Sequence, residues 1–85
     1  MPKTIFITGA SSGIGKAVSI EFCKKGWNVI AAARRIDVLR KISKENSVFS
    51  GKILPISIDI TKGKKVKTKI SKLVKDYGIP DIIFL

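Results

Sequence analysis

A glycine-rich turn near the start of the chain contains the residues whose types and spacing most clearly suggest chemistry. Residues 8–15 have the sequence T-G-A-S-S-G-I-G, with glycines at positions 9, 13 and 15. Gly9 permits a sharp turn out of a strand, Gly13 lets the backbone approach a pyrophosphate, and Gly15 lets the following helix pack close to the strand. A helix N-terminus adds free N–H groups and a favourable dipole for phosphate. The alternative is a turn that needs glycine only for its positive φ.

The elements on either side of this turn strengthen the phosphate interpretation. Residues 4–8 are apolar and β-branched, which predicts a strand, and residues 13–25 predict a helix that ends at Gly26. Residues 27–33 form a second, almost wholly apolar run, typical of a strand buried on both faces. This second strand ends about 18 residues after Gly15, the context in which such a turn binds a dinucleotide.

The inward faces of the first two helices are predicted from the spacing of apolar residues. In the first helix the expected buried face consists of Ile14, Ala17, Val18, Phe22 and Cys23. The second helix is expected over residues 36–46, with Ile36, Leu39 and Ile42 turned inward.

The rest of the chain repeats the alternation of strand and helix. A third strand is expected over residues 52–60, with regular pairing beginning after Pro55, and Thr61 is expected to cap a third helix. That helix has an apolar stripe, and it ends at Gly78 and Pro80; the stripe consists of Val66, Ile70, Leu73, Val74 and Tyr77. Residues 81–85 predict a fourth strand.

This alternation predicts an α/β fold with a Rossmann-like half sheet. We expect a parallel sheet of about four strands in the order 3-2-1-4, with helices on both faces. Because 85 residues allow one small domain at most, we expect residues 1–85 to form an incomplete dinucleotide-binding domain.

Composition excludes several other classes of protein. The hydrophobic fraction of 45% argues against disorder, and the single cysteine, Cys23, excludes an internal disulfide and is expected to be a small core side chain. The chain has no histidine, which excludes a histidine-based metal site or catalytic triad, and we expect no metal site. No apolar run reaches membrane-spanning length and no signal-peptide pattern is present, so we expect a cytoplasmic location and no membrane partner.

The formal net charge of +11 raises the possibility of a nucleic-acid partner. Seven lysines fall between Lys62 and Lys75 with no acidic residue among them, whereas only three of the 17 basic residues are arginine. Readers of base edges depend on arginine and on stacking aromatics. The pattern therefore favours a solvated helix face over a surface that binds nucleic acid.

The turn resembles the glycine motif of the short-chain dehydrogenase/reductase family. Two further segments support the resemblance, namely Ala33-Arg34-Arg35 after the second strand and Ile58-Asp59-Ile60-Thr61 after the third. The similarity extends over essentially the whole chain. It implies a nicotinamide dinucleotide cofactor and hydride transfer to or from a carbonyl or alcohol substrate.

The end of the second strand predicts NADP in preference to NAD. In the NAD-binding form an acidic side chain there accepts bonds from the ribose 2′-hydroxyl. This chain has Ala33 at that position, followed by Arg34 and Arg35, and guanidinium groups pair well with a 2′-phosphate. The alternative is that both arginines are solvated loop residues that bind no phosphate. Asp37 is expected in the first turn of the next helix.

The resemblance also assigns roles to residues on the turn and after the third strand. It implies that Asp59 meets the adenine amino group and that Ile60 contributes backbone groups, unless Asp59 is only a carboxylate near a helix start. Ser11 and Ser12 either donate to phosphate oxygens or are ordinary turn residues. The expected cofactor-binding set is Gly9, Ser11, Ser12, Gly13, Ile14, Gly15, Arg34, Arg35, Asp59 and Ile60.

We expect no catalytic residue within these 85 positions. Members of the family carry a Ser and a Tyr-x-x-x-Lys motif further along the chain. The only tyrosine here is Tyr77, which lies on the apolar stripe as a core or boundary residue and is followed four positions later by Asp81. We therefore expect the N-terminal portion of an NADP-dependent oxidoreductase, whose substrate would need the C-terminal part. A non-catalytic nucleotide-binding module, and after it a basic nucleic-acid-binding protein, are the alternatives.

The fourth strand is expected to leave an apolar edge. Residues 82–85 carry no charge that would protect an unpaired edge from another chain. We therefore expect marginal stability and self-association through this strand.

Overall fold

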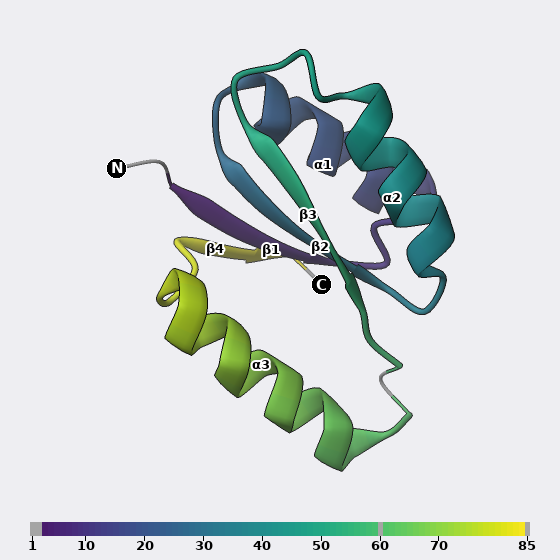
Figure 1. Ribbon diagram of the computed structural model, residues 1–85, viewed down its shortest axis with the longest axis vertical. Helices are drawn as coiled ribbons and strands as arrows, with labels where there is room; N and C mark the ends of the chain where they lie inside the picture. Colours follow the sequence, from purple (N-terminus) through teal and green to yellow (C-terminus); the bar gives the residue numbers. More distant parts are fainter. Residues whose placement is uncertain (1–2, 60, 85) are drawn as a thin grey trace.

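The computed structural model describes residues 3–59 and 61–84, which form one parallel sheet covered by three helices. The strands are β1 (Thr4–Thr8), β2 (Asn28–Ala33), β3 (Lys52–Ser57) and β4 (Ile82–Phe84). The helices are α1 (Gly13–Lys24), α2 (Ile36–Glu45) and α3 (Gly63–Tyr77). The strand order is β3-β2-β1-β4, and every pairing is parallel, as the alternation of strand and helix predicts (Figure 1).

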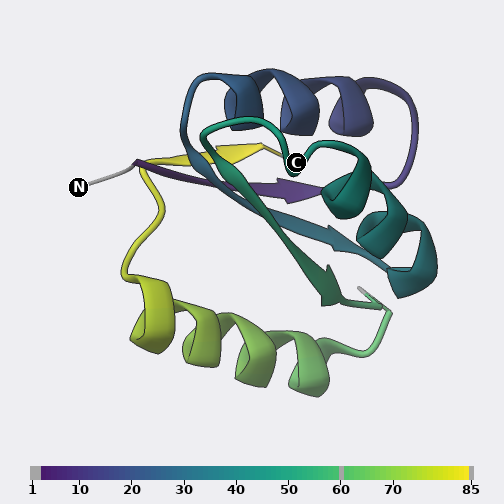
Figure 2. The same ribbon diagram turned by 45° about the horizontal axis from the view of Figure 1, so that its top comes forward.

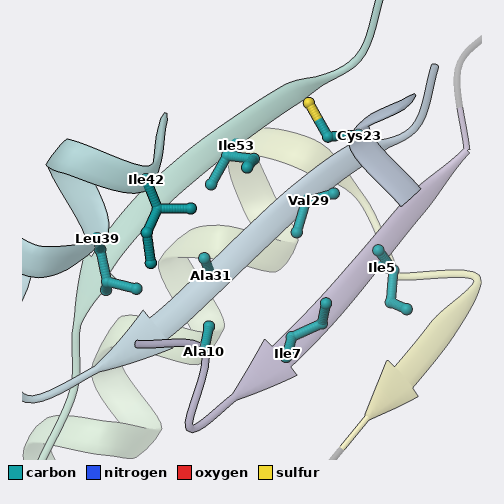
Figure 3. Close-up of a cluster of buried hydrophobic side chains, with 9 residues drawn as sticks. All are labelled: Ile5, Ile7, Ala10, Cys23, Val29, Ala31, Leu39, Ile42 and Ile53. Atoms are coloured by element: carbon teal, nitrogen blue, oxygen red, sulfur yellow. The ribbon is translucent and has the colours of Figure 1, made fainter. Parts of the chain in front are cut away.

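The sheet is covered on both faces, which explains why its central strands are apolar throughout. Helices α1 and α2 lie over one face and α3 lies over the other (Figure 2). Because successive side chains of a strand point to opposite faces, Ile5 and Ile7 join one buried cluster while Phe6 joins the other. Figure 3 shows the first cluster, in which Leu39 and Ile42 of α2 lie with side chains of β1, β2 and β3. The inward face of α2 was therefore predicted correctly for these two residues, whereas Ile36 is only half-buried.

Helix α1 packs through a face that agrees only in part with the expected one, because Cys23, Val18 and Phe22 face the core as expected but Ile14 and Ala17 do not. Its buried residues are Gly15, Ser19 and Cys23, whereas Ile14 is 74% exposed and Ala17 is also exposed. Small residues at four-residue spacing let the helix lie close to the sheet, and the Ser19 hydroxyl donates to the Gly15 carbonyl at 2.7 Å. Larger side chains, Val18 and Phe22 among them, pack at the margins of this contact. Apolar spacing alone missed Gly15 and Ser19, because their place in this contact depends on small size.

Strand β3 begins at the expected residue, Lys52, but its regular pairing starts earlier and the strand ends earlier than expected. Regular pairing starts at Lys52 and includes Pro55, which lies opposite Ala31. Because β3 is an edge strand with only β2 beside it, the missing N–H of proline can face away from the sheet. The strand ends at Ser57, so Asp59 lies in the connection to α3 and not within the strand. Ile60, the expected last strand residue, lies outside the described residues.

Helix α3 covers its face of the sheet incompletely. Of its apolar stripe only Leu73 is buried and Val66 is half-buried, whereas Ile70, Val74 and Tyr77 are 40%, 38% and 47% exposed. Tyr77 is therefore not a core residue, and at 47% exposure it lies at the boundary, the second of the two places expected for it. All seven lysines from Lys62 to Lys75 are exposed, which agrees with a solvated helix face.

Candidate functional site

The turn between β1 and α1 has the backbone shape that its glycines predict. Gly9 and Gly13 have φ values of 63° and 58°, a region that side chains other than glycine rarely adopt. A Cβ atom at either position would meet no protein atom within 4 Å, so open space lies over both residues. Gly15 differs, because a Cβ there would overlap the carbonyl oxygen of Gly9. This glycine lets α1 pack against the turn, as its spacing suggests.

The N-terminus of α1 is open to an anion. Ser12 is the N-cap, its side chain makes no capping hydrogen bond, and no acidic residue lies in the first turn. The first N–H groups of a helix, here those of Gly13, Ile14 and Gly15, have no partner within the helix. A phosphate would therefore meet donors and the positive end of the helix dipole at this point.

A pocket of about 620 Å³ lies at the carboxyl ends of β1, β2 and β3. Such edges of parallel sheets are where α/β proteins bind ligands. Four of the expected cofactor residues line it, and they come from three separate parts of the chain: the turn after β1, the end of β2 and the connection after β3. Five further residues, which were not expected to bind the cofactor, also line it. The expected residues are Gly9, Ser11, Arg34 and Asp59, and the others are Thr8, Ala32, Ala33, Ile58 and Thr61.

The two arginines after β2 have different surroundings. Arg34 lines the pocket. Arg35 is the N-cap of α2, and its guanidinium group pairs with the Asp37 carboxylate at 3.5 Å, with both side chains largely exposed. Asp37 lies in the first turn of α2, as expected. Of the two, Arg34 is therefore the one that the fold places beside the pocket.

Asp59 forms a local structure with Thr61 at the rim of the pocket. The backbone N–H of Thr61 donates to Asp59 Oδ1 at 3.0 Å, and the Thr61 hydroxyl donates to the same oxygen at 2.6 Å. These two bonds, with smaller contributions from the positive charges of Arg34 and Lys62, lower the pKa of Asp59 below its ordinary value. The expected capping role of Thr61 is wrong, because the N-cap of α3 is Lys62 and the hydroxyl is engaged with Asp59.

Most of the remaining expected residues lie next to the pocket, and Ile60 lies outside the residues that the structure describes. Ser12, Gly13, Ile14 and Gly15 form the adjacent N-terminus of α1 and do not line the pocket itself. Ala32 and Ile58 were missed as lining residues because each is an ordinary buried strand or loop residue in sequence. Their approach to one another depends on the order of the strands, which no local pattern shows.

Neither a metal-binding cluster nor a membrane-spanning helix is found in the part of the chain that the structure describes. Over residues 3–59 and 61–84, no three side chains of the His, Cys, Asp and Glu types gather as a metal site would require. None of the helices in those ranges combines the length and apolar character needed to cross a membrane.

Comparison with known proteins agrees with this geometry. The family model described as short chain dehydrogenase matches residues 3–85. An uncharacterized oxidoreductase of Listeria monocytogenes is 41% identical over 83 residues, which cover 98% of this chain and 34% of that protein. The NADP-dependent 3-hydroxy acid dehydrogenase of Schizosaccharomyces pombe is 39% identical, with 95% of this chain and 32% of that protein covered. The chain thus spans about a third of the length of these two relatives.

A solved structure has the same arrangement of strands and helices. The L-sorbose reductase of Gluconobacter frateurii, crystallised with NADPH and L-sorbose, superimposes with a TM-score of 0.84 at 29% identity. The alignment covers 96% of this chain and 32% of the reductase.

Proposed function

This chain belongs to the short-chain dehydrogenase family, a family of oxidoreductases, and from that premise we propose that residues 1–85 bind the adenosine and pyrophosphate part of NADP. The observation that carries the proposal is the pocket at the carboxyl ends of three parallel strands, where Gly9, Ser11, Arg34 and Asp59 meet. On this proposal residues 1–85 are the first part of a dinucleotide-binding domain.

The residues present fit such a cofactor. Open space over Gly9 and Gly13 leaves room for a pyrophosphate to approach the backbone, and the N-terminus of α1 would supply donors to it. Ser11 and Ser12 would add hydroxyl groups. Asp59 would accept a bond from the adenine amino group and Ile60 would contribute backbone groups. The adenine would rest near the apolar side chains of Ile58 and Ala32.

NADP is proposed over NAD because of the charge at the end of β2. Ala33 leaves no carboxylate there to repel a 2′-phosphate, and Arg34 lines the pocket with a guanidinium group. Arg35 would contribute from the start of α2, although its pairing with Asp37 partly neutralises it. The named relative from Schizosaccharomyces pombe is NADP-dependent, which supports the same choice.

The cofactor, when bound, would supply or accept a hydride in the oxidation or reduction of an alcohol or carbonyl substrate. We assign no catalytic residue within residues 1–85, whose part in this proposal is to bind and orient the cofactor. The substrate would be recognised by residues outside this range. We propose a cytoplasmic location as well, consistent with the free, buried thiol of Cys23, and we propose no nucleic-acid partner.

A titration with NADPH and NADH tests the proposal. We expect saturable binding that is tighter for NADPH, and we expect Gly13→Val to abolish it by filling the space over the turn. Gly78→Val is the matched control, because Gly78 also has a positive φ of 81° and open space around it but lies at the end of α3. Absence of nucleotide binding by the wild-type chain, or equal loss in both variants that remain folded, would refute the proposal.

A further inference from the structure

The carboxylate of Asp59 is held in one orientation by a single neighbour. Both hydrogen bonds to its Oδ1 atom come from Thr61, one from the backbone and one from the hydroxyl group. The 2.6 Å bond from the hydroxyl is short, as expected for a donor that faces an ionised acceptor. Because Oδ1 is occupied in this way, Oδ2 is the oxygen through which Asp59 can accept a bond from a ligand.

Both residues line the pocket, so this local structure faces the ligand site. The pocket wall beside them is apolar, formed in part by Ile58, Ala32 and Ala33. A flat ring would fit against such a wall, and a fixed carboxylate at its edge would select for a ring that carries an N–H donor. An ionised carboxylate only accepts hydrogen bonds, so it discriminates against a ring that presents a carbonyl oxygen at the same position.

Resting on the proposed function, we propose that Thr61 is a positioning residue: it orients the Asp59 carboxylate to accept a bond from the exocyclic amino group of adenine, and so makes the pocket select 6-amino purines over 6-oxo purines. Thr61 does not itself touch the base in this proposal. It acts by holding Oδ1, so that the second oxygen keeps a fixed direction toward the ligand.

The electrostatics of the site support this role. The Thr61 bonds lower the pKa of the Asp59 carboxyl group, and the positive charges of Arg34 and Lys62 act in the same direction. Without the two bonds from Thr61 the Asp59 carboxylate would be free to rotate, because Asp59 lies in the connection between β3 and α3 and not in a strand. The Thr61 hydroxyl has no competing role as a helix cap, since Lys62 occupies that position.

The test compares NADPH with its hypoxanthine analogue, which differs by a carbonyl oxygen in place of the amino group. Affinities are measured for the wild-type chain, Thr61→Val, which lacks the hydroxyl donor, and Thr61→Ser, which keeps it. Thr68→Val is the matched control, because the Thr68 hydroxyl bonds only within α3, to the Lys64 carbonyl at 3.1 Å. Carbon NMR follows the titration of the Asp59 carboxyl group in each variant.

We expect the wild-type chain to bind NADPH about tenfold more tightly than the analogue, the preference that one hydrogen bond to a charged group provides. Thr61→Val should reduce that preference to about twofold and raise the pKa of Asp59, whereas Thr61→Ser and Thr68→Val should leave both unchanged. A preference that persists in folded Thr61→Val, or that the wild type lacks, overturns the inference while leaving the proposed function intact.

Two measurements keep the outcomes distinct. If the wild type binds neither nucleotide, the proposed function fails and the inference fails with it. If Thr61→Val does not fold, Thr61→Ala takes its place, because it also lacks the hydroxyl donor to Asp59 Oδ1. An unchanged preference for NADPH in folded Thr61→Ala would overturn the inference.

Discussion

Arg34 and Arg35 are adjacent in the chain, but the fold gives them different neighbours. Arg34 lines the pocket, whereas Arg35 starts α2 and pairs with Asp37. An exposed ion pair of this kind contributes little to stability, but it directs the Arg35 guanidinium toward a carboxylate. At the scale of single residues, the sequence motif leaves the two arginines equivalent and the structure separates them.

We predict that Arg34→Ala weakens NADPH binding about tenfold or more while changing NADH binding little, because a charge-assisted contact to the 2′-phosphate is lost. Arg35→Ala should have a smaller effect, since part of its charge is already compensated by Asp37. Isothermal titration calorimetry of both variants with both cofactors measures this. A larger loss in Arg35→Ala would show that the pair with Asp37 opens when the cofactor binds.

Cys23 allows a prediction about pH. The thiol is 1% exposed, and burial raises its pKa above the ordinary value of 9.0. The folded chain therefore holds this proton more tightly than the unfolded chain, so the contribution to stability is complete below that ordinary value and is lost as the pH rises through the raised pKa.

Urea denaturation between about pH 8 and about pH 10 should show this loss, with a slope of at most about 1.4 kcal/mol per pH unit beyond that of Cys23→Ala. The variant removes the titrating group while the lysines remain, so the difference between the two proteins isolates the thiol. Identical slopes would mean that Cys23 is accessible to water in the folded chain.

At the scale of elements, the contact between α1 and the turn before it determines the shape of the site. A Cβ at Gly15 would overlap the carbonyl oxygen of Gly9, so no larger residue fits without moving the helix. Ser19 and Cys23 continue the same close contact along α1. The open N-terminus of the helix therefore depends on a row of small residues, of which apolar spacing predicts only Cys23.

We predict that Gly15→Ala lowers the free energy of unfolding by about 1–3 kcal/mol, the usual cost of overpacking a close contact. Gly63→Ala is the control, because it also lies in the first turn of a helix, has ordinary φ and meets no atom within 4 Å. That change should be neutral or slightly stabilising, since alanine favours helices. Denaturant titrations of the two variants give the comparison, and equal effects would argue against the close contact.

At the scale of the whole molecule, the two faces of the sheet are covered unequally and the β4 edge is exposed. Helices α1 and α2 bury one face, whereas α3 leaves Ile70, Val74 and Tyr77 partly exposed on the other. Strand β4 pairs with β1 through three residues, and its Ile82 and Ile83 are 40% and 60% exposed. The apolar edge expected from the sequence is confirmed for the described residues 82–84.

We predict that this chain self-associates through β4 and that Ile83→Lys reduces the association, because a charge on an edge strand opposes pairing with a second edge. Val48→Lys is the matched control, since Val48 is also highly exposed, at 83%, but lies between α2 and β3. Sedimentation velocity at several concentrations measures the effect. A wild-type chain that stays monomeric, or equal behaviour of both variants, would exclude this edge as the interface.

Local sequence patterns were enough to predict the order of elements, the parallel sheet and the glycine-rich turn. These features depend on local signals: apolar runs for buried strands, periodic apolar residues for α2, and glycines where φ is positive, as at Gly9 and Gly13. Such signals are read within a few residues, so their prediction needs no knowledge of distant contacts.

Which residues share the pocket, and which helix faces are buried, could not be predicted from local patterns and became clear only from the packing of the elements. Thr61 lies beside Asp59 and not at a helix cap, and Arg34 rather than Arg35 lines the pocket. The buried face of α1 follows from the close approach of Gly15 to Gly9, and the exposure of Tyr77 follows from what covers α3. Each of these depends on the distance between elements, and that distance is set by packing across the whole sheet, which no local pattern encodes.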